Sequence, residues 1–194
     1  KARLYFRQIL SGLEYMHANG IMHRDIKPDN ILMSNELVCK ISDFGVSKMI
    51  WESGSDLVHQ SVGTPAFMSP ELCHIGAVES HGYSDDVWAL GITLYALLMG
   101  RLPFYRDDLF ELYEAIQHDE LCLKDCRASP ACQDLLRSML DKAEPNRISV
   151  PDMFKHPWVT DHGRDPMPPL TLTDDKAIDQ VLSLIHISDG AREA

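Results

Sequence analysis

Hydrophobic residues recur at intervals of three and four along most of the chain, a spacing that predicts a mainly helical protein. The first such stretch predicts a helix over 2–18, which the pair Asn19-Gly20 ends. Two short apolar runs predict strands at 31–34 and 38–41. The buried side of the first helix is expected to carry Tyr5, Ile9, Leu10, Leu13 and Met16.

The most apolar stretch predicts a helix over 84–99 in the middle of the core, because apolar side chains cover nearly all of its faces. Ser84 is expected to cap that helix, with Asp85 and Asp86 near its positive end. The polar stretch 47–62, by contrast, has the composition of a mobile loop. Weaker patterns predict further helices at 108–118, at 131–140 and from Ser149 onward.

Composition and charge restrict the class of protein. The 194 residues suffice for one domain with its own core, and a hydrophobic content of 45% with 24% charged residues is ordinary for a globular chain. With 18 basic and 29 acidic side chains the net charge is −11, which argues against nucleic-acid and anionic-membrane partners. No apolar run has the length of a membrane span, and residues 1–10 lack a signal-peptide pattern.

The cysteines indicate a compartment rather than a metal site. Five cysteines, an odd number without paired spacing, predict a reducing environment, the cytoplasm with the nucleus as the alternative. Three of them lie between Cys122 and Cys132, but no CxxC motif or suitably spaced histidine accompanies them. We therefore expect buried or idle thiols at these positions.

The chain divides by composition into three parts. A domain over 1–159 is followed by a polar tail over 160–181 that is rich in Pro and Asp. The last part, 182–194, contains a run over 182–188 that resembles the translation of a sequencing adapter, so we expect this part to be non-native; a short native apolar tail is the alternative. Because the first helical pattern begins at Lys1 without a cap, we expect the domain to be truncated.

Three polar motifs stand in order along the first domain. They are His-Arg-Asp-Ile-Lys-Pro-Asp-Asn over 23–30, Asp-Phe-Gly over 43–45 and Ser-Pro-Glu over 69–71. Taken singly, their Asp and Asn residues are best explained as turn or capping residues. Together they meet the needs of phosphoryl transfer, which are charge neutralisation and in-line placement. An Asp can orient a hydroxyl and accept its proton, a Lys can offset phosphoryl charge, and Asp and Asn oxygens suit Mg²⁺.

In this order and spacing the motifs resemble those of the eukaryotic protein kinases, over roughly 2–159. The resemblance implies a mainly α fold, the large C-terminal lobe of a kinase with short β-strands at the catalytic cleft and with the small N-terminal lobe absent. It implies ATP and Mg²⁺ as cofactors, Asp25, Lys27 and Asn30 as catalytic residues, and Asn30 with Asp43 as metal ligands. The nucleotide site is then expected to comprise Lys27, Asp29, Asn30, Leu32 and Asp43.

The same resemblance assigns regulatory and supporting positions. The segment 43–71 resembles an activation segment, in which Ser61 is the candidate for an activating phosphate that pairs with Arg24; an unmodified Ser61 is the alternative. Thr64 resembles the substrate-docking threonine, and Ser69 stands where the family usually has Ala. Supporting roles are implied for His23 and Phe44 in the regulatory spine, for Asp86 beneath the catalytic loop, and for Glu71 and Arg147 as a buried ion pair.

Lys27 is typical of Ser/Thr rather than Tyr kinases. The segments 46–47, 63–71 and 156–159 look most like the calcium/calmodulin-dependent protein kinase kinases and their fungal and plant relatives, which implies another kinase's activation loop as substrate. Calmodulin control is not supported, because the tail has no basic cluster. The alternatives are a non-catalytic kinase-like scaffold and another calmodulin-dependent-like kinase subfamily. Because no Gly-rich loop or strand lysine precedes His23, the chain alone is expected to be inactive.

Overall fold

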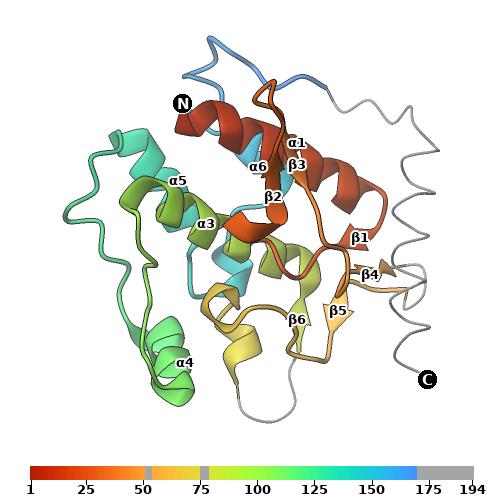
Figure 1. Ribbon diagram of the computed structural model, residues 1–194, viewed down its shortest axis with the longest axis vertical. Coiled ribbons are helices and arrows are strands. Elements are labelled where there is room, and N and C mark those ends of the chain that lie inside the picture. The colour runs from red at the N-terminus through yellow and green to blue at the C-terminus, as the bar shows by residue number, and fades with distance from the viewer. Residues whose placement is uncertain (51–53, 75–78, 170–194) are drawn as a thin grey trace.

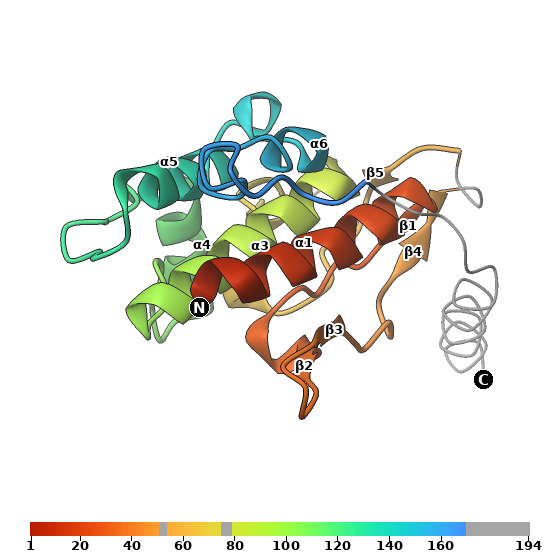
Figure 2. The same ribbon diagram turned by 90° about the horizontal axis from the view of Figure 1, so that it is seen from above.

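Two long helices, α1 (Ala2–Ala18) and α3 (Gly82–Met99), lie side by side at the centre of the fold (Figures 1 and 2). The helix predicted over 2–18 is therefore confirmed, whereas the helix predicted from Ser84 begins two residues earlier. His81, rather than Ser84, occupies the N-terminal cap position of α3. The computed structural model describes residues 1–50, 54–74 and 79–169.

Gly82, the first residue of α3, lies in a closely packed position. A Cβ atom at this position would lie 2.3 Å from the sulfur of Met22 and 3.1 Å from Val58. A larger residue at 82 would therefore require the Met22 side chain to shift. Ser84 lies within the first turn, where its side-chain and backbone oxygens both accept hydrogen bonds from Arg147.

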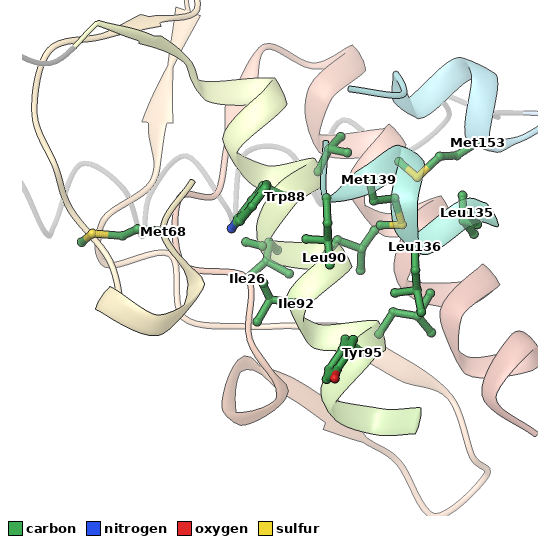
Figure 3. Close-up of a cluster of buried hydrophobic side chains, with 14 of the residues drawn as sticks. Ile26, Met68, Trp88, Leu90, Ile92, Tyr95, Leu135, Leu136, Met139 and Met153 are labelled. Carbon is green, nitrogen blue, oxygen red and sulfur yellow. The ribbon is translucent and has the colours of Figure 1, made fainter. Parts of the chain in front are cut away.

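The core surrounds α3 and is shared with the helices that follow it. Trp88, Leu90, Ile92 and Tyr95 are fully buried on α3, and Figure 3 shows them beside side chains of the later helices. The expectation that α3 is buried on all faces fails at its end, since Leu97 is 52% exposed. The buried partners from the later helices are Leu135, Leu136, Met139 and Met153.

α1 is amphipathic and buries one side only. Its buried stripe begins at Phe6 rather than at the predicted Tyr5, which is half-buried. Phe6 is drawn into the core because its ring packs edge-on against Trp158, with ring centroids 5.4 Å apart. The rest of the stripe is as predicted, and consists of Ile9, Leu10, Leu13 and Met16.

Three later helices complete the helical part, and each begins at a polar cap. Asp108, Ser129 and Ser149 each accept a hydrogen bond from the backbone N–H three residues later. Each cap leaves one fewer unpaired backbone donor in the first turn. The helices are α4 (Leu109–His118), α5 (Pro130–Met139) and α6 (Val150–Met153).

The described strands are short and pair in three antiparallel ladders. β2 (Ile31–Met33) pairs with β3 (Cys39–Ile41), and these two strands were predicted, each one residue longer. The prediction of an unstructured loop over 47–62 is wrong in part, because two strands form within it. The other pairs are β1 (Ile21–Met22) with β4 (Lys48–Met49) and β5 (Leu57–Val58) with β6 (Ser80–His81).

The beginning of the expected tail is docked on α1. Arg7 donates to the backbone oxygens of Val159, Asp165 and Pro166, and also to the Asp165 carboxylate. The tail expected over 160–181 is described only as far as residue 169. The whole of segment 182–194 lies outside the described residues. Within the described part of the chain, no helix combines the length and apolarity of a membrane span.

Candidate active site

The carboxylate of Asp25 is the centre of a hydrogen-bond network. Asp25 lies on the loop between β1 and the 3₁₀ turn η1 (Pro28–Asn30), directly after Arg24, whose φ is 66°. One oxygen, Oδ2, accepts from Lys27 Nζ at 2.8 Å and from Asn30 Nδ2 at 3.1 Å. The other, Oδ1, accepts from Thr64 N at 3.0 Å and from Thr64 Oγ1 at 2.8 Å. The left-handed backbone at Arg24 is a strained conformation of the kind found at functional sites.

This network keeps Asp25 ionised. Burial disfavours its charged form, but the hydrogen bonds from Lys27 and Thr64, together with the Lys27 charge, outweigh that effect and hold the pKa of Asp25 below its usual range. An ionised carboxylate can accept a hydrogen bond from an incoming hydroxyl and orient it. The arrangement therefore suits a carboxylate that positions a nucleophile.

Lys27 links Asp25 to the segment on the opposite side of the cleft. Its Nζ donates to Thr64 Oγ1 at 2.6 Å as well as to Asp25. Gly63, just before Thr64, has a φ of 105°, and a Cβ there would lie 2.5 Å from the backbone oxygen of Arg24. The close contact between the two loops thus depends on glycine at 63.

Asn30 and Asp43 each carry a side-chain oxygen of a kind that can bind a metal ion. Both hydrogen atoms of the Asn30 amide are used by Asp25, because Nδ2 donates to its backbone oxygen and to Oδ2, so the amide oxygen points the other way. Ser42 joins the two motifs, since its N–H and hydroxyl both donate to the Asn30 backbone oxygen. Asp43 follows directly, with an exposed side chain and a φ of 63°.

These oxygens have the chemistry of Mg²⁺ ligands. The Asp43 carboxylate accepts the N–H of Gly45 at 3.2 Å through Oδ1 and is otherwise presented at the surface. A carboxylate and an amide oxygen are hard ligands, and Mg²⁺ in such sites takes its other ligands from phosphate and water. In the described ranges, no group of three or more His, Cys, Asp and Glu side chains could hold a metal ion without such help.

Asp86 supports the catalytic loop from α3. Its fully buried carboxylate accepts the backbone N–H of His23 at 2.9 Å and that of Arg24 at 2.7 Å. His17 of α1 lies 2.9 Å from the same carboxylate. The buried His23 ring lies 5.3 Å from the ring of Phe44 and contacts the Ser42 backbone oxygen. The loop is therefore held at its backbone, independently of the side chains that face the cleft.

The predicted ion pair between Glu71 and Arg147 is present. Arg147 Nη2 lies 2.7 Å from Glu71 Oε1, with the Arg147 side chain fully buried. The guanidinium group also donates to Ser84 and to the Asp141 backbone oxygen, and lies over the ring of Trp88. The pair connects the end of the segment 43–71 to the loop before α6.

Other predicted site residues are placed apart from this network. Ser61 is exposed and its hydroxyl donates to the Leu72 backbone oxygen at 2.7 Å, while Arg24 donates to the Val46 oxygen. The pairing of a phosphorylated Ser61 with Arg24 therefore stays a prediction. Asp29 and Leu32 are both exposed, Asp29 on η1 and Leu32 on β2. A cavity of about 660 Å³ lies elsewhere, between the end of α1 and the loop before α6.

Sequence reasoning missed one polar cluster near the site. Asp85, expected only as a charge at the start of a helix, accepts hydrogen bonds from Ser69 and Ser80. The available signal was the combination of a serine at 69, in place of the usual alanine, with two adjacent aspartates at 85 and 86. No motif links these positions, and their contact depends on the fold.

A helical core that holds an Asp-Lys-Asn loop against a threonine-bearing segment is the arrangement expected of the protein kinase family. The protein kinase domain family matches residues 1–159, and the chain belongs to this family. The chain is 41% identical over 169 residues to the calcium/calmodulin-dependent protein kinase kinase cmkC of Emericella nidulans, covering 87% of this chain and 32% of that protein.

Two further relatives are Ser/Thr kinases of a plant and a yeast. The chain is 38% identical over 158 residues to GRIK2 of Arabidopsis thaliana, covering 81% of this chain and 38% of the relative. It is 39% identical over 189 residues to ssp1 of Schizosaccharomyces pombe, covering 93% of this chain and 29% of that relative. The chain thus spans well under half the length of these relatives.

Proposed function

We propose that this chain provides the catalytic loop and substrate-binding segment of a Ser/Thr protein kinase, which transfers the γ-phosphate of ATP to a protein hydroxyl. The single observation that carries the proposal is the joint hydrogen bonding of Asp25 by Lys27, Asn30 and Thr64. A structural turn would not need a lysine and a threonine from a distant segment on one carboxylate.

In this proposal each side chain has a separate task. Asp25 accepts the hydrogen bond of the substrate hydroxyl and takes its proton as that oxygen bonds to the γ-phosphorus and the bond from the γ-phosphorus to the departing ADP breaks. Lys27 is placed beside that hydroxyl, where its charge offsets the negative charge of the phosphoryl group. Thr64 holds the substrate-binding segment against the catalytic loop through its contacts with both residues.

Asn30 and Asp43 are proposed to hold Mg²⁺ together with the phosphates of ATP. The amide oxygen of Asn30, whose nitrogen donates to Asp25, and the exposed carboxylate of Asp43 are hard ligands of the kind that Mg²⁺ prefers. When bound, Mg²⁺ neutralises phosphate charge and aligns the γ-phosphate. Asp29 and Leu32, at the exposed edge of the same loop and hairpin, are proposed to border the nucleotide.

The proposed substrate is the activation loop of another kinase, in a cytoplasmic or nuclear setting. This finer proposal is supported by similarity to cmkC, whose name describes a kinase kinase, and by the sequence likeness over 63–71. We do not extend the calmodulin dependence in that name to this chain, because the sequence after Trp158 has no basic cluster. Phosphorylation of a panel of kinase activation-loop peptides, against unrelated Ser/Thr peptides, tests this assignment.

The 194-residue polypeptide is proposed to be inactive by itself. Protein kinases cover ATP with a Gly-rich loop and a strand lysine that precede the catalytic loop, and residues 1–22 hold neither. ATP-dependent phosphorylation is therefore expected from the full-length gene product that contains this chain, and loss of it with Asp25→Ala. Unchanged transfer in Asp25→Ala contradicts the proposal; Mg²⁺-independent partner binding without transfer indicates a scaffold instead.

A further inference from the structure

Asp85 is a buried acid that the proposed phosphoryl transfer does not use. It lies in the first turn of α3 with 5% of its surface exposed. Its Oδ1 accepts from Ser69 Oγ at 2.5 Å, and its Oδ2 accepts from Ser80 Oγ at 2.7 Å. Both serines are also buried. A bridge of three side chains, Ser69-Asp85-Ser80, therefore joins α3 to β6 and to the segment that follows Thr64.

The bridge holds the last residue of segment 64–69, whose first residue contacts Asp25. Thr64 is bonded to Asp25, and Ser69 is bonded to Asp85. Between them lie the 3₁₀ turn η2 (Pro65–Phe67) and Met68. A small cavity of about 10 Å³ lies between the two ends, and its lining includes Asp25, Thr64, Ser69 and Asp85.

Thr64 donates two hydrogen bonds to one of the Asp25 oxygens, so segment 64–69 begins directly beside the carboxylate that is proposed to take the substrate proton. We propose that Asp85, acting through Ser69, is a positioning residue that sets segment 64–69 relative to Asp25 and so seats the protein substrate. The proposal rests on the proposed kinase function. Asp86, the residue after Asp85 on α3, holds the catalytic loop, so the start of α3 positions both sides of the reaction site.

The bridge does not depend on the charge of Asp85. Burial, reinforced by the nearby charges of Glu71 and Asp86, raises the pKa of Asp85 to about 7, against the hydrogen bonds from Ser69 and Ser80. A serine hydroxyl both donates and accepts, so each serine can pair with the ionised or the protonated carboxyl. An asparagine at 85 can likewise accept from one serine and donate to the other. Asp85→Asn is therefore the conservative variant that preserves the bridge.

Steady-state kinetics of the full-length gene product that contains this chain tests the proposal. Ser69→Ala and Asp85→Ala are expected to raise the KM for a peptide substrate about tenfold, the effect of losing the hydrogen bond that holds Ser69, with the KM for ATP unchanged. Asp85→Asn is expected to keep the wild-type KM for peptide. Ser80→Ala is the matched control, since it removes the other hydrogen bond of the same carboxylate but leaves Ser69 bound; its KM for peptide should not change.

The outcomes separate this inference from the proposed function. Loss of transfer in Asp25→Ala with a wild-type peptide KM in Ser69→Ala refutes the positioning role and leaves the kinase function standing. Equal rises in KM for Ser69→Ala and Ser80→Ala also refute it, because they indicate general loosening. If Asp85→Ala does not fold, hydrogen exchange over 61–69 decides: faster exchange in Ser69→Ala than in Ser80→Ala supports the role, and equal exchange overturns it.

Discussion

Replacing Asp86 by alanine is the most informative single change for the architecture of the site. The variant removes the acceptor for two backbone donors, the N–H groups of His23 and Arg24, and the partner of the His17 ring. Because Asp86 is fully buried, water cannot readily replace the lost acceptor. An unsatisfied buried donor costs about 1–3 kcal/mol, so the two backbone groups predict a loss of about 2–6 kcal/mol in the free energy of unfolding.

The loss is expected to fall on the catalytic loop first. Arg24 holds a φ of 66°, a conformation that persists only while its surroundings enforce it. A loss of this size is a large part of the about 5–15 kcal/mol that stabilises a typical domain. We therefore expect Asp86→Ala to lower both the stability of the chain and the kcat of the full-length gene product.

Urea unfolding of the 194-residue chain, followed by circular dichroism, measures this prediction through the transition midpoint. Asp125→Ala is the control, because Asp125 is an exposed aspartate and such a change is expected to stay within about 0.5 kcal/mol. Asp86→Asn keeps one acceptor oxygen and should fall between the control and Asp86→Ala. A loss below about 1 kcal/mol for Asp86→Ala would refute the reasoning, since it would mean that the two backbone donors find other partners at no cost.

Three further predictions concern the Glu71–Arg147 ion pair, the buried Asp85 carboxyl and the exposure of the cysteines. Glu71→Ala leaves the Arg147 guanidinium buried without its ionic partner, so we expect urea unfolding to show a loss of about 3–5 kcal/mol, with a smaller loss in the double variant with Arg147→Met. The folded-state pKa of Asp85, about 7, exceeds the usual value of 3.8, so the free energy of unfolding should fall as pH rises from about 4 to about 7. Asp85→Asn should flatten this dependence. A urea midpoint of the wild type that does not change with pH speaks against the prediction. Iodoacetamide should label the exposed Cys122 well before Cys73, whose pKa burial raises to about 12; mass spectrometry that finds Cys73 labelled first contradicts this.

The helices could be predicted because their signals are local. The spacing of apolar residues predicted α1 with its correct limits, and Ser149 was correctly expected at the start of the last helix. The start of α3 was expected at Ser84, a favourable cap residue, whereas the helix begins at Gly82 with His81 in the cap position. The strands β4 and β5 escaped prediction because they have two residues each, and their pairing partners lie far away in the sequence.

The functional site likewise combines features with a sequence signal and features that depend on contacts between residues far apart in the sequence. The cluster around Asp25 follows from residues whose order along the chain is itself the signal, so Lys27 and Thr64 could be named in advance. The contact of Ser69 with Asp85 could not, since the two residues are joined only when the segment after Thr64 folds onto α3. Whether Ser61 carries a phosphate is not decided by its position in the fold, where it is exposed and bonded to the Leu72 backbone oxygen.

The central claim is that Asn30 and Asp43 hold magnesium and a nucleotide next to Asp25. The most direct measurement is calorimetric titration of the full-length gene product with a non-hydrolysable ATP analogue, with and without Mg²⁺, for the wild type and for Asp43→Asn. The account predicts tight binding that requires Mg²⁺ in the wild type, and a marked weakening in Asp43→Asn. Equal affinity in the presence and absence of Mg²⁺, or an unchanged affinity in Asp43→Asn, would contradict it.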